Sequence, residues 1–289
     1  ASTVITFSGA SPKVDTTDAN ITLTGPVVIS NGELDINSAG GNIEITGAIT
    51  SDGVNEALIL DDGTGTTGTI TLGSTVSSGS ITLIGDDGIT LGGNLTSTAT
   101  TDGAISFTGP VTLGANITID ADAANTDVNF TSAQTTINAT SAGAQSLTID
   151  TDAGNVSIQG AIGGSAKLSA LSIDNADGAG TIEVFTIGTT SAVGVEGSTL
   201  IGNTNTATLT LDGADYRTTG LQTYTTAAGD KILVGVDDTA IDFISTDTNI
   251  SFVGGDLVIK DSADTTIATQ AVGATASVGN ISFGGAIHG

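Results

Sequence analysis

The sequence contains no cysteine, no methionine and no tryptophan, and among its 289 residues only 7 are phenylalanine and 2 are tyrosine. Without cysteine the chain has no disulfide framework, no thiolate metal site and no thiol nucleophile. Compact globular cores are normally filled with aromatic and methionine side chains, which this chain mostly lacks. We therefore expect small and β-branched side chains to pack a narrow core built from repeated layers.

Basic residues are also scarce. The chain has 5 Lys and Arg against 31 Asp and Glu, which gives a formal net charge of −26. Such a charge repels DNA, RNA and anionic lipid surfaces, so we expect no nucleic-acid partner. No window approaches 18 consecutive apolar residues, so we expect no membrane insertion. The acidity is typical of proteins that stay dissolved outside the cell, and it leaves cation binding open.

Helical periodicity is missing, whereas short strand signals occur along the whole chain. Low aromatic content and high charge are also typical of disorder, but 38% of the residues are hydrophobic and they recur in short alternating runs. Each run is bounded by Gly, Asn, Asp or Ser, which is typical of short strands joined by tight turns. The predicted strands include residues 4–7, 21–23, 43–45, 69–72, 81–83, 105–107, 117–119, 147–149, 156–158, 209–211, 250–252, 257–259 and 281–283.

These runs are copies of one phrase. ITLTGPVVI at residues 21–29 matches ISFTGPVTL at residues 105–113, and related phrases occupy residues 42–49, 155–162 and 280–287. One such unit cannot bury its apolar face alone, so neighbouring copies must stack, which predicts an all-β solenoid. A tandem β-sandwich is the alternative, because its strands are also short and closely spaced. We expect one β-solenoid domain over residues 1–289, either as a mature protein or as a segment of a longer chain.

Two phrases resemble a known family. GAIGGSAKLSALSI at residues 160–173 is followed by YRTTGLQTY at residues 216–224. This pair resembles the repeats of bacterial filamentous-haemagglutinin-like adhesins and related autotransporter passengers. The resemblance implies a right-handed parallel β-helix that serves as the shaft of a secreted surface protein. The full pair occurs clearly only once here, and no secretion domain or membrane anchor is visible.

Aspartates in turns are the candidate cation ligands. Asp-Asp-Gly occurs at residues 61–63 and 86–88, and a third aspartate pair occupies positions 237 and 238. Calcium favours several carboxylate and carbonyl oxygens, which turns rich in Asp, Asn and Gly supply. Neither an EF-hand loop nor the Gly-Gly-x-Gly-x-Asp nonapeptide is present, so solvated turn residues remain the other interpretation. The candidate calcium ligands are Asp61, Asp62, Asp86, Asp87, Asp237 and Asp238.

The sequence offers little for catalysis. His288 is the only histidine and lies beside the last residue, where a positioned general base is not expected. Paired carboxylates could indicate a glycan-processing β-helix enzyme, with Asp120, Asp122 and Asp127 as a further loose group. Adjacent carboxylates on an extended chain point to opposite faces, however, so a sequential pair is not a catalytic pair. We predict no catalytic residues, no enzymatic activity and no cofactor other than a candidate calcium ion.

The predicted function is structural or adhesive. We expect an extracellular protein of the bacterial cell surface that forms the rigid acidic shaft of an adhesin or fibre. The alternative is a subunit that assembles end to end into a filament or surface layer, because uncapped strand edges template the addition of another chain. A polysaccharide-processing enzyme is the less favoured alternative. The expected partners are copies of the chain, adjacent solenoid segments, and host or environmental surface glycans.

Overall fold

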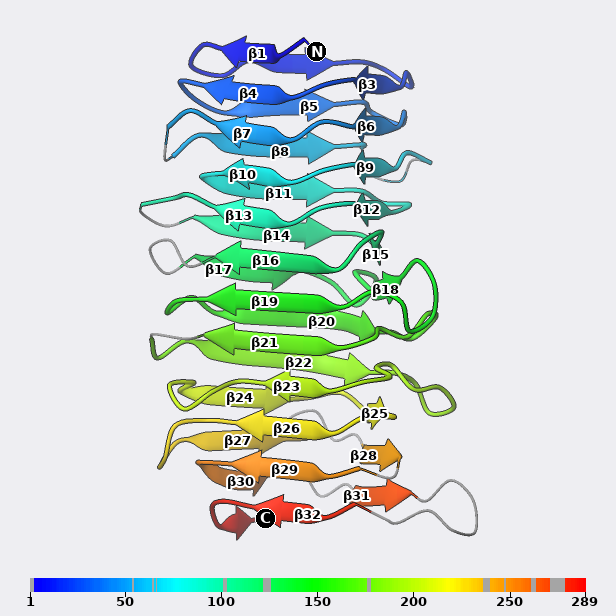
Figure 1. Cartoon of the computed structure of the whole chain (residues 1–289), viewed down its shortest axis with the longest axis vertical. Helices are drawn as coiled ribbons and strands as arrows, with labels where there is room; N and C mark the ends of the chain where they lie inside the picture. Colours follow the sequence, from blue (N-terminus) through cyan, green and yellow to red (C-terminus); the bar gives the residue numbers. More distant parts are fainter. Residues whose placement is uncertain are drawn as a thin grey trace.

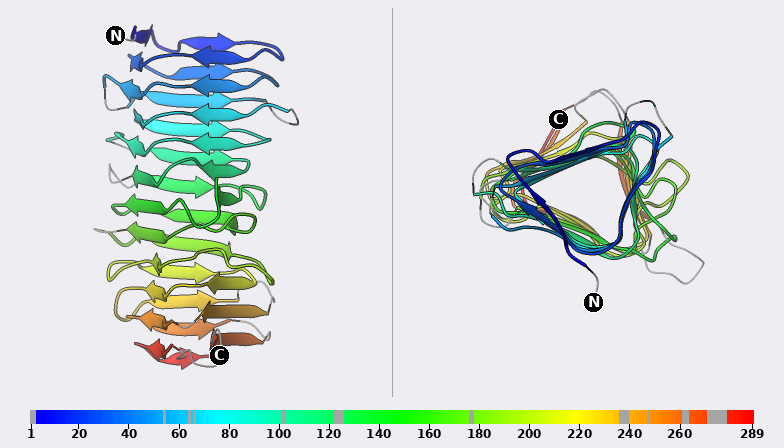
Figure 2. Two further views of the ribbon diagram at one scale, coloured as in Figure 1. Left: turned by 45° about the vertical axis from the view of Figure 1, so that its right-hand side comes forward. Right: turned by 90° about the horizontal axis from the view of Figure 1, so that it is seen from above.

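The computed structural model describes residues 3–53, 55–63, 65, 67–100, 103–121, 126–175, 178–235, 240–246, 248–260, 264–270 and 279–289. These residues form 33 strands and no helix. The chain winds as a parallel β-solenoid with its two termini at opposite ends of the stack (Figure 1). Seen along the long axis, each coil is triangular, and the three sides are three flat β-faces (Figure 2).

The first side, face A, is a sheet of 12 strands in which each coil contributes one. Its strands are β1 (Ile5–Ser8), β4 (Val27–Ser30), β7 (Ile49–Ser51), β10 (Val76–Ser78), β13 (Leu95–Ser97), β16 (Ile117–Ala121), β19 (Leu147–Thr151), β21 (Leu171–Asn175), β23 (Thr199–Ile201), β26 (Gln222–Thr225), β29 (Ile250–Val253) and β32 (Ile281–Phe283).

The second side, face B, follows face A within each coil. Its strands are β2 (Lys13–Asp15), β5 (Leu34–Asn37), β8 (Ala57–Asp61), β11 (Ser80–Ile84), β14 (Ala104–Thr108), β17 (Asp127–Phe130), β20 (Val156–Ile162), β22 (Thr181–Ile187), β24 (Thr208–Leu211), β27 (Lys231–Val234), β30 (Asp256–Ile259) and β33 (Ile287–His288).

The third side, face C, closes the triangle. Strands β20 and β22 are long enough to turn the corner, so their carboxyl-terminal parts belong to face C as well. The other strands of face C are β3 (Ile21–Leu23), β6 (Ile43–Ile45), β9 (Ile70–Leu72), β12 (Ile89–Leu91), β15 (Val111–Leu113), β18 (Ile137–Ala139), β25 (Asp215–Thr218), β28 (Ile241–Thr246) and β31 (Thr265–Gln270).

All the paired strands that the structure describes run parallel, in register with the coils above and below. In β14, for example, Ile105 pairs with Ile81 of β11 on one side and with Val128 of β17 on the other. The burial of successive residues alternates along each strand, as expected when alternate side chains point into the core. The predicted β-helix is therefore confirmed. The tandem β-sandwich is wrong, because sandwich sheets are built from antiparallel strands.

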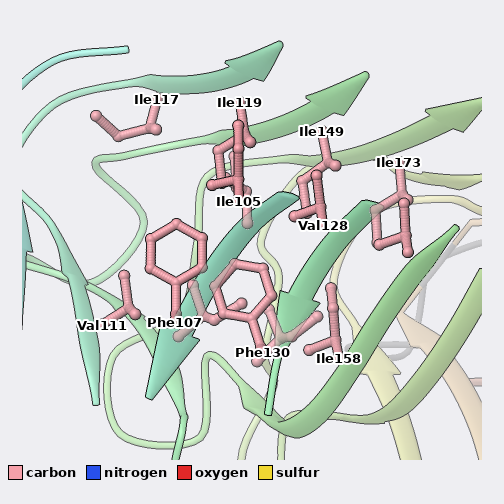
Figure 3. Close-up of a cluster of buried hydrophobic side chains, with 14 of the residues drawn as sticks. Ile105, Phe107, Val111, Ile117, Ile119, Val128, Phe130, Ile149, Ile158 and Ile173 are labelled. Atoms are coloured by element: carbon pink, nitrogen blue, oxygen red, sulfur yellow. The ribbon is translucent and has the colours of Figure 1, made fainter. Parts of the chain in front are cut away.

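The core is a continuous column of Ile, Val and Leu side chains that are almost completely buried. Figure 3 shows a section of it, where Phe107 and Phe130 of consecutive coils stack with ring centroids 4.5 Å apart. Near the carboxyl-terminal end, Tyr216 stacks on Phe243 at 4.7 Å and Tyr224 stacks on Phe252 at 5.3 Å. Small and β-branched residues thus dominate the packing as expected, and most of the rare aromatic residues gather in these stacks.

Asparagines at the corners connect one coil to the next. The Oδ1 atom of Asn20 accepts the backbone N–H of Asn42, whose own Oδ1 accepts the backbone N–H of Thr69 one coil further on. The same coil-to-coil bond is made by Oδ1 of Asn94, Asn116, Asn155 and Asn249, each of which directly precedes a strand. Each bond satisfies a backbone donor at a point where the strand ladder is interrupted. These asparagines are therefore corner residues that help to hold consecutive coils together.

The glycine of the repeated phrase allows the chain to turn tightly against the preceding coil. Gly109, which ends the ISFTG phrase, has a φ of +108°, and a Cβ atom there would lie 1.9 Å from the carbonyl oxygen of Gly85. Only glycine adopts this conformation without strain and leaves room for the neighbouring backbone. This close approach explains why the phrase retains glycine where its other positions vary.

Candidate functional site

The structure brings the first two aspartate pairs together at one corner of the solenoid. Strand β8 ends at Asp61, which pairs with Ile84 at the end of β11 one coil further on. Asp62 and Asp86 therefore leave their strands at the same corner of consecutive coils. We call Asp61, Asp62, Asp86 and Asp87 the acidic corner.

The carboxylates of the acidic corner accept backbone hydrogen bonds. Asp61 Oδ1 accepts the N–H of Gly63 at 2.8 Å, and Asp62 Oδ1 accepts the N–H of Asp86 at 3.2 Å. Asp86 Oδ2 in turn accepts the N–H of Gly65 in the preceding coil. These bonds shape the two turns and tie them to each other, so the aspartates have a structural role whether or not they bind a cation.

Asp62 is the unusual member of the acidic corner, because its side chain is completely buried. Burial raises its pKa from 3.8 to about 6, and the nearby charges of Asp86, Asp61 and Asp87 add to the increase. The hydrogen bond from the Asp86 backbone acts in the opposite direction, because it stabilises the ionised form. At neutral pH the chain therefore holds a buried negative charge beside three more carboxylates.

A surface groove of about 540 Å³ adjoins this corner. Asp86 and Asp87 form one part of its lining, and Gly65 of the preceding coil and hydroxyl, amide and glycine groups of the following coils form the rest. The lining residues are Gly65, Asp86, Asp87, Thr108, Gly109, Ser132 and Gln134.

The described residues offer few ligands for the predicted calcium ion. Within the described ranges, no group of three or more His, Cys, Asp or Glu side chains is arranged to hold a metal ion. Asp237 and Asp238 lie outside the described residues. Calcium binding at the acidic corner therefore stays a prediction, and the backbone hydrogen bonds there support the interpretation as turn residues.

A second set of carboxylates was not found from the sequence. Asp120 of β16, Asp150 of β19 and Asp174 of β21 occupy the same position on three consecutive strands of face A. Asn203 Nδ2 donates to Asp174 Oδ1 at the end of this row. Alignment of the phrases ITIDA, LTIDT and LSIDN could have revealed the row, because the aspartate has the same place in each.

Of the loose group of acids predicted from the sequence, the two members that the structure describes lie on different faces. Asp120 lies on face A, whereas Asp127 begins strand β17 of face B and accepts the backbone N–H of Asn155. Asp122 lies outside the described residues.

A basic residue, Arg217, forms the most enclosed ion pairs on the surface. Its Nε donates to Asp215 Oδ1 at 2.7 Å and its Nη2 donates to Asp242 Oδ2 at 2.6 Å. Thr190 also donates to the second oxygen of Asp215, at 3.3 Å. A smaller groove of about 170 Å³ lies beside this cluster.

The YRTTGLQTY phrase, which carries the family resemblance, places four of its nine residues in the core. Tyr216, Gln222 and Tyr224 are each completely inaccessible to solvent. The Gln222 amide donates to the carbonyl oxygens of Tyr216 and Ile244 at 2.9 Å and 2.8 Å, and its Oε1 accepts the Tyr224 hydroxyl at 2.9 Å. The buried residues of this phrase thus help to form a corner of the core.

Comparison with known proteins assigns no family. No protein-family model matches the chain, and no significant match was found among curated proteins or solved structures. In the described part of the chain there is also no helix with the length and apolarity needed to cross a bilayer.

Proposed function

We propose that this protein is the rigid, acidic shaft of a bacterial extracellular adhesin or fibre. The observation that carries the proposal is the unbroken parallel stack of coils around a single apolar column. Twelve strands at a spacing of ~4.8 Å make a rod roughly 55 Å long.

Such a rod is stiff for two reasons. Each coil is hydrogen-bonded to its neighbours on all three faces, so bending would break bonds along a whole side of the triangle. The core side chains are stacked in register and close-packed, which leaves no layer along which coils could slide. The charge of −26 adds repulsion between neighbouring rods and keeps them apart.

The adhesin assignment rests on the resemblance of residues 160–173 and 216–224, and the extracellular location rests on the same phrases and on the acidity.

No catalytic role is part of the proposal. A reducing-sugar assay on a panel of polysaccharides tests that exclusion, since release of new sugar ends would show a glycan-processing enzyme.

Small-angle X-ray scattering and negative-stain electron microscopy test the shaft directly. We expect isolated rods of uniform length, roughly 55 Å at the strand spacing, with no bend between coils. Rods that bend at variable positions, or round particles, would contradict a load-bearing shaft.

A second candidate function, end-to-end assembly, is favoured by a match between the two end coils. Strand β1 at one end reads Ile5-Thr6-Phe7, and strand β32 at the other end reads Ile281-Ser282-Phe283, both on face A. Ile281 and Phe283 are each 39% exposed, although the residues they pair with, Ile250 and Phe252, are buried.

A second copy placed with β1 under β32 would therefore continue both the hydrogen-bond ladder and the stack of Phe252 on Phe283. Sedimentation velocity over a range of concentrations decides this question. Assembly that increases with concentration and is abolished by Phe283→Asp would support the second candidate, whereas monomers at every concentration would overturn it.

A further inference from the structure

Two neighbouring coils carry insertions that project from face C. Two columns of paired residues run through three consecutive coils of this face. The first column is Ile162, Ile187 and Tyr216. The second column is Leu168, Val195 and Thr218. Between the two aligned positions, one coil inserts residues 163–167, the next inserts residues 188–194, and the third has Arg217 alone. The two insertions must therefore bulge outwards, one above the other. We call residues 188–194 the ledge.

The ledge is an ordered turn rather than a loose loop. Thr189 and Ala192 exchange two backbone hydrogen bonds, of 2.9 Å and 3.1 Å, as a short antiparallel bridge. Its last residue, Gly194, donates its N–H to the carbonyl oxygen of Arg217 in the following coil at 2.9 Å. Its first residue, Gly188, donates its N–H to the carbonyl oxygen of Ile162 in the preceding coil at 2.8 Å, so the ledge is fixed at both ends.

A groove of about 170 Å³ lies between the ledge and the outer surface of β25, β28 and β31. We call it the ledge groove. The ledge forms one wall, and three consecutive coils form the floor with the outward side chains of Arg217, Ile244, Thr246 and Gln270 and with the buried Thr218. The lining residues are Thr190, Ser191, Ala192, Val193, Arg217, Thr218, Ile244, Thr246 and Gln270.

The floor of the ledge groove combines a flat, partly apolar strip with polar groups at its sides. Arg217 and Ile244 are paired residues of adjacent strands, and Thr246 is paired with Gln270 further along the same strands. Arg217 is held by Asp215 and Asp242, and its side chain is only 16% exposed, so its guanidinium group is ordered before any ligand arrives. Binding to a pre-ordered group avoids the entropic cost of fixing a long side chain.

Charge and size restrict the ligand. Arg217 is balanced by two carboxylates in a chain of net charge −26, so the groove offers no excess positive charge to an anionic ligand. A volume of about 170 Å³ is below the roughly 300 Å³ of pockets for drug-sized ligands. Hydroxyl and amide groups beside an apolar surface match a sugar ring, which presents C–H groups on its face and hydroxyls at its rim.

We propose that the ledge groove binds one ring of a neutral oligosaccharide. The ring lies on Ile244 and Arg217, and its hydroxyls exchange hydrogen bonds with the hydroxyl and amide groups of the ledge and of Thr246 and Gln270. This site goes beyond the shaft function and does not depend on it, because a rod without the groove would have the same core and length.

The test uses the full chain and saturation-transfer difference NMR. The probes are chitohexaose, cellohexaose, mannohexaose and the anionic hexamer of galacturonic acid. The blocking variant is Ser191→Trp, because Ser191 is exposed on the ledge and lines the groove. The matched control is Ser165→Trp, because Ser165 is an exposed serine of the insertion above and is not part of the groove lining.

We expect at least one neutral hexamer to bind the wild type, and the galacturonate hexamer not to bind. Ser191→Trp should weaken binding by about tenfold or more through steric exclusion, and Ser165→Trp should leave it unchanged. The proposal is overturned if no neutral hexamer binds, if galacturonate binds as well as they do, or if Ser191→Trp binds like the wild type. Scattering profiles of both variants report separately on the shaft, so the two proposals fail independently.

Discussion

Replacing the buried Asp62 by asparagine should stabilise the protein at neutral pH. The ionised side chain is buried beside three carboxylates, and its pKa is raised from 3.8 to about 6. Asparagine keeps an oxygen that accepts the 3.2 Å hydrogen bond from the Asp86 N–H, and it carries no charge. Asp62→Asn therefore removes an unfavourable interaction while retaining the backbone contact.

The size and pH range of the effect follow from the pKa. Below about pH 4, Asp62 is protonated in both the native and the unfolded chain, so the substitution changes little. Between about pH 4 and pH 6 the unfolded chain loses the proton first, and the free energy of unfolding of the wild type falls as the pH rises. Above pH 6 the full difference in pKa lowers the free energy of unfolding by about 3 kcal/mol, and solvent screening of the neighbouring charges reduces this cost to between about 1 and 3 kcal/mol.

Urea denaturation followed by circular dichroism, at several values between pH 4 and pH 8, measures this difference. Asp87→Asn is the matched control, because it removes the same charge from an exposed position of the same corner. We expect the control to change the stability by less than about 0.5 kcal/mol. An Asp62→Asn variant that is less stable than the wild type near pH 7.5, or whose gain is the same at every pH, would refute the reasoning.

Three further predictions concern the corners, the core and the net charge. Gly254 and Gly229 both have a φ near +90°. A Cβ atom at Gly254 would lie 1.9 Å from the Thr226 carbonyl oxygen, whereas a Cβ atom at Gly229 would contact nothing within 4 Å. In thermal melts, Gly254→Ala should therefore lower the stability by about 3 kcal/mol or more and Gly229→Ala by about 1 kcal/mol. The Tyr216 hydroxyl contacts two carbonyl oxygens and the Gly213 N–H, whereas the Tyr224 hydroxyl contacts only Gln222 among the hydrogen bonds described. Tyr216→Phe should therefore cost about 2 kcal/mol and Tyr224→Phe about 1 kcal/mol in urea titrations, and equal costs would contradict this assignment. Added sodium chloride should raise the melting temperature near pH 7.5 by screening the net charge of −26, and a decrease would show that attractive ion pairs outweigh the repulsion.

The acidic corner and the Asp120–Asp150–Asp174 row show where sequence reasoning reached its limit. The pairs at positions 61–62 and 86–87 were identified as candidates, but their contact depends on Asp61 being paired with Ile84. The row on face A was missed, because spacings of 30 and 24 residues separate its members and only the strand register aligns them. Coils of unequal length obscure such alignments, since a difference of a few residues in one corner shifts every later position.

The ledge groove could not be predicted from the sequence either, because its residues carry no recognisable pattern. Residues 163–167 and 188–194 have no strand pattern, and Arg217 reads as an isolated basic residue in the sequence. Only the alignment of Leu168, Val195 and Thr218 across three coils places the ledge over Arg217 and Ile244.

The sequence alone determined the class of fold, because the alternating apolar phrase and its glycine recur along the chain and one copy cannot bury its face without another. It also determined the acidic surface, which is a matter of composition. The tertiary structure decided which residues meet, since in a solenoid every lateral contact joins residues of different coils and the register between coils is set by packing of the whole core. For that reason the burial of Asp62, the pairing of Arg217 with Asp215 and Asp242, and the grooves beside them follow from the stacked coils and from no local pattern.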